Sequence, residues 1–129
     1  MTGCAFGDEP AELRHHPTGR DEHGRYLDPD LTLPACHDDH TFVHDDWRDL
    51  GIEAVERPLT FFDRVETRLR RLATNCRRMD PAGVNPFWTK LAAALVRWAD
   101  EIARGTRRLD ERDPGWRDDP GFYPDGPAR

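Results

Sequence analysis

Histidines crowd into one short part of the chain, at spacings that could bind a metal ion. All six lie within the 30 residues from His15 to His44. His40 and His44 are four residues apart, so on a helix their rings return to nearly the same face, about 6 Å apart along the axis. Two such imidazoles can share one divalent ion. Without a third ligand, however, this pair is common on solvated helices.

The tandem pair His15-His16 could supply that third ligand. Neighbouring residues on a strand point to opposite sides, so one ring can bind a metal while the other faces a substrate. His40 lies 24 positions after His16. That separation fits the rest of a hairpin and the start of a helix, which would bring the pair against the helix face. Because the pair and the spaced histidines occur together, we expect a metal site.

The elements that would position these residues can be read from the N-terminal half. Frequent Gly and Pro exclude long helices before residue 35. We expect a strand over Ala11–His16, a polar loop over 17–29, and a return strand around Leu31 and Leu33. From Cys36 to Leu50 there is no Pro or Gly, which predicts a helix of about four turns, ended by Gly51.

The second half predicts two amphipathic helices. Thr60 and Asp63 resemble a capping box, and apolar residues then recur every three or four positions as far as Met79. A Pro/Gly turn follows, and Asn85 with Pro86 caps the next helix. Its apolar stripe is expected to form the core of an antiparallel helix pair; it comprises Trp88, Leu91, Leu95, Trp98, Ile102 and Leu109. Cys76 is expected to be buried and inert.

Charge divides the chain into three segments. Residues 1–56 have a net charge of −10, residues 57–112 of +6, and residues 113–129 of −2. We predict a metal-binding N-terminal domain (1–56), a basic helical hairpin (57–112) and a flexible Pro/Gly-rich tail (113–129). No apolar run could span a membrane, and the first ten residues do not have the pattern of a secretory signal. Three scattered cysteines favour a reducing, cytoplasmic setting.

The stretch from Leu13 to Arg48, which reads LRHHPTGRDEHGRYLDPDLTLPACHDDHTFVHDDWR, resembles the HNH (ββα-metal) endonucleases. It is most similar to the variant with a His-His pair, as in colicin-type DNases. The resemblance covers 36 of 129 residues. It implies an α+β fold with a treble-clef-like ββα-metal motif, followed here by the two long helices and the irregular tail.

The resemblance also implies roles for individual residues. His15, His40 and His44 would hold the metal, and His16 would be the general base that activates water. The middle Asn of the family motif falls near Asp30, which would brace the loop and orient the base. Asp can accept the same backbone hydrogen bonds but cannot donate.

Many members of this family carry a structural zinc held by two CxxC pairs. Here Cys4 and Cys36 are the first cysteines of two such pairs, but Gly7 and Asp39 stand where the second cysteines would be. Two thiolates do not make a closed tetrahedral zinc site. We expect this zinc to be absent; the alternative is that another ligand, such as His37, replaces the lost thiols.

The chemistry implied is phosphodiester hydrolysis with one divalent ion. A neutral His16 would accept a proton from water. Arg14 and Arg20 are the nearest cations that could steady the phosphorus centre. Imidazole ligands favour Zn²⁺, Ni²⁺, Co²⁺ or Mn²⁺, and Mg²⁺ stays open. The densest basic cluster of the hairpin is expected to contact DNA phosphates; it comprises Arg68, Arg70, Arg71, Arg77 and Arg78.

Three functions stay open on the sequence alone. The first is a metal-dependent DNA endonuclease or nickase of a bacterial or phage genome. The second is a catalytically degenerate HNH-like module that binds DNA or assists assembly, which the missing cysteines and Asp30 motivate. The third is a metal-binding protein without nuclease activity, whose helix pair associates with itself or with another protein. An Arg-rich helix can also be a merely solvated surface.

Overall fold

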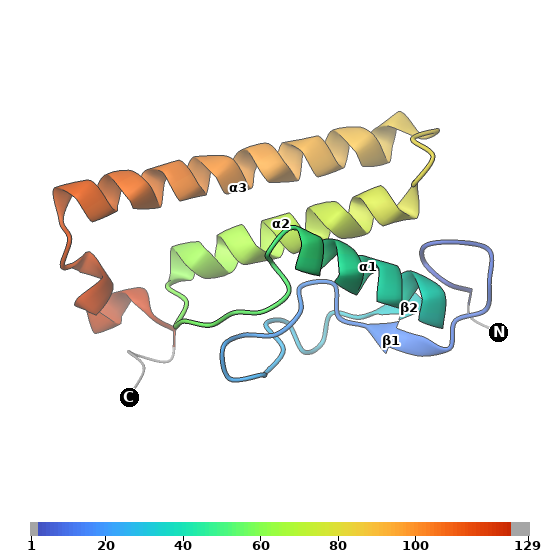
Figure 1. The fold of residues 1–129 in the computed structure, drawn as a ribbon, viewed down its shortest axis with the longest axis horizontal. Helices are drawn as coiled ribbons and strands as arrows, with labels where there is room; N and C mark the ends of the chain where they lie inside the picture. The colour runs from blue at the N-terminus through green and yellow to red at the C-terminus, as the bar shows by residue number, and fades with distance from the viewer. Residues whose placement is uncertain (1–2, 125–129) are drawn as a thin grey trace.

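The computed structural model describes residues 3–124, in which a two-stranded sheet is followed by three α-helices (Figure 1). The elements in chain order are β1 (Leu13–His15), β2 (Leu33–Ala35), α1 (His37–Asp49), α2 (Phe61–Met79), α3 (Pro86–Arg112) and the 3-10 turns η1 (Trp116–Asp118) and η2 (Pro120–Phe122). The mixed α+β class, the ββα order and the helical hairpin agree with the sequence. The treble-clef identity of the motif stays a prediction.

The β-hairpin and α1 enclose the first core. β1 and β2 pair antiparallel, with His15 opposite Leu33, and α1 begins two residues after β2. Buried residues from the N-terminal loop, β2 and α1 pack together here: Cys4, Phe6, Ala35, Cys36, Val43 and Trp47. Gly51 has a positive φ of 72° just after α1, as expected for a residue that ends a helix.

Helices α2 and α3 form the expected antiparallel pair (Figure 1). The capping box of Thr60 and Asp63 is present, and the Asn85 side chain accepts a hydrogen bond from the Phe87 N–H. Small residues let the helices approach, since Ala73, Cys76 and Ala92 form the core between them. The prediction for Trp98 is wrong: its side chain is 57% exposed, because the α3 surface that contacts α2 is centred on the alanines.

Helix α2 lies between α3 and the β-hairpin with α1 (Figure 1). The α2 surface that faces the hairpin and α1 is polar. It carries three buried side chains, spaced three or four residues from the first: Arg71, Thr74 and Asn75. The Trp47 indole N–H donates to the Thr74 hydroxyl. Residues 1–56 and 57–112 therefore share a buried, hydrogen-bonded interface.

The segment after α3 differs from the flexible tail that the sequence predicts. Through residue 124 it folds back on the start of α2, and Trp116 is only 3% exposed. Trp116 packs against Phe62 and donates its indole N–H to Asp110. Residues 125–129 of the predicted tail lie outside the described residues. Within residues 3–124, no helix combines the length and apolar character that a bilayer crossing requires.

Candidate metal centre

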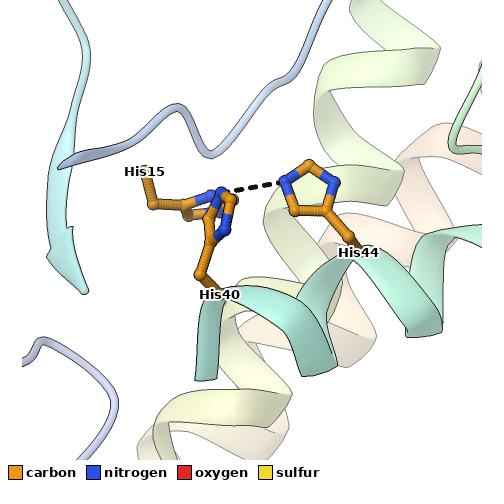
Figure 2. Close-up of side chains that lie close together, drawn as sticks. All are labelled: His15, His40 and His44. Carbon is orange, nitrogen blue, oxygen red and sulfur yellow. Dashed lines mark hydrogen bonds between the residues drawn. The ribbon is translucent and has the colours of Figure 1, made fainter. Parts of the chain in front are cut away.

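Three imidazoles meet between the β-hairpin and α1. One nitrogen from each of His15, His40 and His44 lies within 4.8 Å of the others. The ring centroids of His15 lie 5.1 Å from His40 and 5.6 Å from His44. The Nε2 atoms of His40 and His44 are 3.0 Å apart, and Figure 2 shows the three rings pointing toward one another. The structure therefore brings together the residues that the sequence predicts as metal ligands.

Local structure explains this convergence. β1 turns the His15 side chain inward, where it is fully buried. α1 starts at His37, so His40 falls in its first turn and His44 lies one turn later on the same face. The short connection from β2 to α1 fixes that face against His15.

Hydrogen bonds around His15 determine which of its nitrogens is free. The Asn75 amide Nδ2 lies 2.9 Å from the Pro17 carbonyl and 2.7 Å from the Arg71 carbonyl, so it must be the donor. Asn75 Oδ1 therefore faces His15 Nε2, at 2.8 Å, and accepts its proton. The Nδ1 lone pair of His15 is buried, and no hydrogen-bond partner for it exists among residues 3–124. A buried acceptor without a partner is costly unless something occupies it.

His44 is oriented in the same way by a carboxylate. Its Nδ1 lies 2.9 Å and 3.0 Å from the two oxygens of Glu53. A carboxylate accepts, so Nδ1 carries a proton, and in the neutral ring that binds a metal Nε2 would present its lone pair toward His40. Asn75 and Glu53 thus act on the outer nitrogens of two rings. Neither partner was identified from the sequence.

Burial favours the neutral form of His15 and His40, the form that can bind a metal ion. It lowers the pKa of His15 from 6.5 to about 4, against a hydrogen bond to Asn75 that acts in the opposite direction, and nearby His40 and His44 lower it further. Burial also lowers the pKa of His40, and His44 contributes to the same shift. Three nitrogen donors that leave other directions free would suit a divalent ion such as Zn²⁺, Mn²⁺ or Ni²⁺.

His16, predicted as the general base, lies on the other side of the strand and does not join the three rings. Its imidazole stacks on the Tyr26 ring with centroids 3.5 Å apart and an angle of 9°. Arg20 belongs to the same group: its guanidinium lies 4.6 Å from the Tyr26 centroid and donates to the Tyr26 hydroxyl. Arg14 is exposed on β1.

The loop between the strands is braced by Asp28, not by the predicted Asp30, which is exposed. Asp28 accepts hydrogen bonds from the Thr18 hydroxyl at 2.6 Å and from Arg68 Nε at 2.9 Å. Burial opposes ionisation of Asp28, but the hydrogen bonds from Arg68 and Thr18 outweigh it and hold its pKa below the usual value. Asp21 adds to the bracing by accepting the backbone N–H groups of His23 and Arg25.

Arg71, predicted to contact DNA, is instead a structural residue. Its side chain is fully buried and donates to the carbonyl oxygens of Thr18, Arg20, Ile52 and Glu53. Gly19 lies against it: a Cβ there would stand 2.5 Å from the Arg71 guanidinium, and the φ of Gly19 is +70°. Only glycine fits this position, because any side chain would clash and the backbone is left-handed.

The other arginines predicted to bind phosphate are mostly paired inside the protein. Arg68 pairs with Asp28, Arg70 with Glu66 and Asp100, and Arg78 with Asp39. Arg77 is exposed. A count of charges along the sequence does not distinguish a basic surface from an internal ion-pair network.

A second cluster forms from the two cysteines of the predicted knuckles. Cys4, Cys36 and Asp39 place one potential ligand atom each within 4.8 Å of one another. Both cysteines are buried. A hydrogen bond to Asp39, then burial, raises the pKa of the Cys36 thiol. His37, the alternative replacement ligand, is exposed.

Comparison with known proteins adds no relative: no family model, no curated protein and no solved structure matches this chain.

Proposed function

We propose that this chain is a metal-dependent DNA endonuclease or nickase of the HNH type. One observation carries the proposal: three imidazoles converge, and the outer nitrogens of His15 and His44 are engaged by Asn75 and Glu53. Rings oriented in this way direct lone pairs to a common point, and the buried Nδ1 of His15 has no other use among the described residues. The resemblance of residues 13–48 to the HNH endonucleases supports the reaction class.

The proposed roles follow from where each side chain lies. His15, His40 and His44 would hold the ion, which when bound would polarise a phosphate oxygen and stabilise the leaving oxygen. His16 would accept the proton of the attacking water, and its stacking on Tyr26 would hold the ring in place. Arg20, beside the same tyrosine, and Arg14, exposed on β1, are the cations available for the phosphate.

Plasmid nicking tests the proposal. Purified protein is assayed with Mn²⁺, Mg²⁺, Ni²⁺ and Zn²⁺, each against a chelator control. We expect His16→Ala to reduce nicking by roughly 10²- to 10⁴-fold and to leave metal binding intact, whereas His40→Ala should abolish both. His23→Ala is the matched control, since His23 lies in the loop, its side chain pairs with Glu22, and the backbone N–H that Asp21 accepts is kept in the variant. Absence of nicking with every metal would refute the nuclease.

A second candidate is a degenerate module that binds DNA without cutting it. The close stacking of His16 on Tyr26 favours it, because a ring covered on one face has less freedom to approach a substrate. In that case the protein would bind DNA at low salt, with a salt-dependent affinity, but would not nick it. Metal binding that depends on His40, without any DNA binding, would instead favour the third function, a metal-binding protein whose helices associate with a partner.

A further inference from the structure

The cluster of Cys4, Cys36 and Asp39 has each of its polar groups already engaged. The Cys4 sulfur accepts the backbone N–H groups of Phe6 at 3.4 Å and of Cys36 at 3.1 Å. The thiols of Cys4 and Cys36 both donate to Asp39 Oδ2, at 3.5 Å and 3.0 Å. One carboxylate oxygen thus serves both sulfurs.

The other oxygen of Asp39 accepts hydrogen bonds from an arginine in a different part of the fold. Arg78, in the last turns of α2, donates to Asp39 Oδ1 through Nε at 3.0 Å and through Nη2 at 2.9 Å. Its guanidinium also lies 4.3 Å from the Phe42 ring centroid. One cation therefore neutralises the one carboxylate of the cluster.

The fourth ligand position that two knuckles would need is Gly7, which has no side chain to offer a metal ion. Gly7 stands three residues after Cys4, as Asp39 stands three after Cys36, and a Cβ on Gly7 would lie 3.5 Å from Asp39 Oδ2. The four positions lie together as the ligand positions of two metal-binding knuckles would. They offer only two sulfurs and one carboxylate, and that carboxylate is already bound to a guanidinium. A structural zinc site needs four ligands that close around the ion.

We propose that Arg78 is the cation of this cluster and takes the place that a structural metal ion would otherwise fill. The thiols, Asp39 and Arg78 then form a metal-free tie. It joins the N-terminal loop, the first turn of α1 that carries His40, and the end of α2. The inference does not depend on nuclease activity, and it means that the thiols never act as metal ligands.

Cobalt titration of the full chain tests this directly. Co²⁺ bound by imidazoles alone gives visible d–d absorption, whereas Co²⁺ bound by thiolates adds an intense charge-transfer band in the near ultraviolet. We expect the native protein to show no thiolate band at any Co²⁺ concentration. A band that disappears in Cys4→Ser or Cys36→Ser would overturn the proposal.

Two variants complete the test. Gly7→Cys with Asp39→Cys restores four thiols, and we expect it to gain the thiolate band and to bind one more Zn²⁺ per chain than the native protein. If the double variant gains neither, the four positions do not form a metal-binding knuckle and the proposal fails.

Arg78→Met should lower the midpoint of thermal unfolding, measured in excess chelator, by roughly 5 °C or more relative to the native protein. An unchanged midpoint would also refute the proposal. Arg77→Met, an exposed neighbour, is the matched control.

Discussion

Two clusters of potential metal ligands meet on helix α1, and they differ in what their donor atoms already do. In the imidazole cluster, partners outside the cluster take the outer nitrogens of His15 and His44, and His15 Nδ1 is left buried without a partner among the described residues. In the cysteine cluster the thiols, the carboxylate and Arg78 satisfy one another. Proximity of donor atoms is the same in both, within 4.8 Å. Unused lone pairs, and not closeness alone, therefore make the imidazole cluster the better candidate for a metal site.

The largest expected effect is a complete contrast in metal binding between the clusters. Removing a ligand ring by His40→Ala should cost more than the roughly 10- to 100-fold that loss of an outer partner costs. Cys36→Ala should leave the affinity for Zn²⁺ or Mn²⁺ unchanged. Isothermal titration measures both. If Cys36→Ala lowers the number of ions bound per chain, the cysteine cluster also binds metal, and the contrast between the two clusters is wrong.

With a chelator present, the two clusters should lower the free energy of unfolding at opposite ends of the pH range. The pKa of His15 is 6.5 in the unfolded chain and about 4 in the folded protein. Between these two pH values, His15 is protonated in the unfolded chain but stays neutral in the folded one. The free energy of unfolding should therefore fall as the pH drops through this window, by on the order of 3 kcal/mol. The raised pKa of Cys36 acts on the alkaline side: above pH 9.0 the unfolded thiol ionises first, so stability falls as pH rises.

Urea unfolding at a series of pH values separates these contributions. Subtracting the profile of His15→Leu from that of the native chain isolates the acid limb, and Cys36→Ala does the same for the alkaline limb. If His15→Leu retains the full acid slope between pH 6.5 and 4, the buried imidazole is not its source.

How much of this could be predicted from the sequence depends on how local each feature is. The spacing of His40 and His44, the capping box at Thr60, and Asn85 with Pro86 are local patterns, and the structure contains all three. The approach of the His15-His16 pair to α1 followed from the length of the hairpin, and the choice of His15 as the ligand followed from the family resemblance. The local patterns needed only neighbouring residues and periodicity.

The partners of those residues were not predictable in the same way. Asn75 reaches His15 across 60 positions, and Arg71 reaches Thr18 across 53. On the sequence Arg71 belongs to a basic run, and only the docking of α2 turns it inward. One signal was present: Arg71, Thr74, Asn75 and Arg78 repeat at helical spacing, a polar stripe that a merely solvated helix does not require.

That polar stripe allows a prediction of intermediate size about the imidazole cluster. Asn75→Ala should weaken metal binding by roughly 10- to 100-fold, because His15 loses the acceptor that fixes its tautomer. Thr74→Ala is the control: it removes the hydrogen bond from Trp47 in the same interface but touches no imidazole. Equal losses of metal affinity in both variants would mean that general packing, and not the tautomer of His15, sets the affinity.

The smallest effect should come from Glu53, the half-buried counterpart of the buried Asn75. Glu53→Gln keeps an oxygen that can accept from His44 Nδ1 and removes only the charge, and the Glu53 side chain is 35% exposed. We therefore expect the metal affinity to fall by at most about tenfold, the lower end of such effects. Glu56→Gln, the same change at an exposed carboxylate three residues later, should have no effect. If both variants lower the metal affinity equally, or if high salt abolishes the difference, the charge of Glu53 acts only through its long-range field. If the difference persists in high salt, the charge of Glu53 acts on His44 at contact distance, because water and salt screen contacts at this distance far less than distant charges. No loss of affinity in Glu53→Gln would mean that the accepting oxygen alone is sufficient.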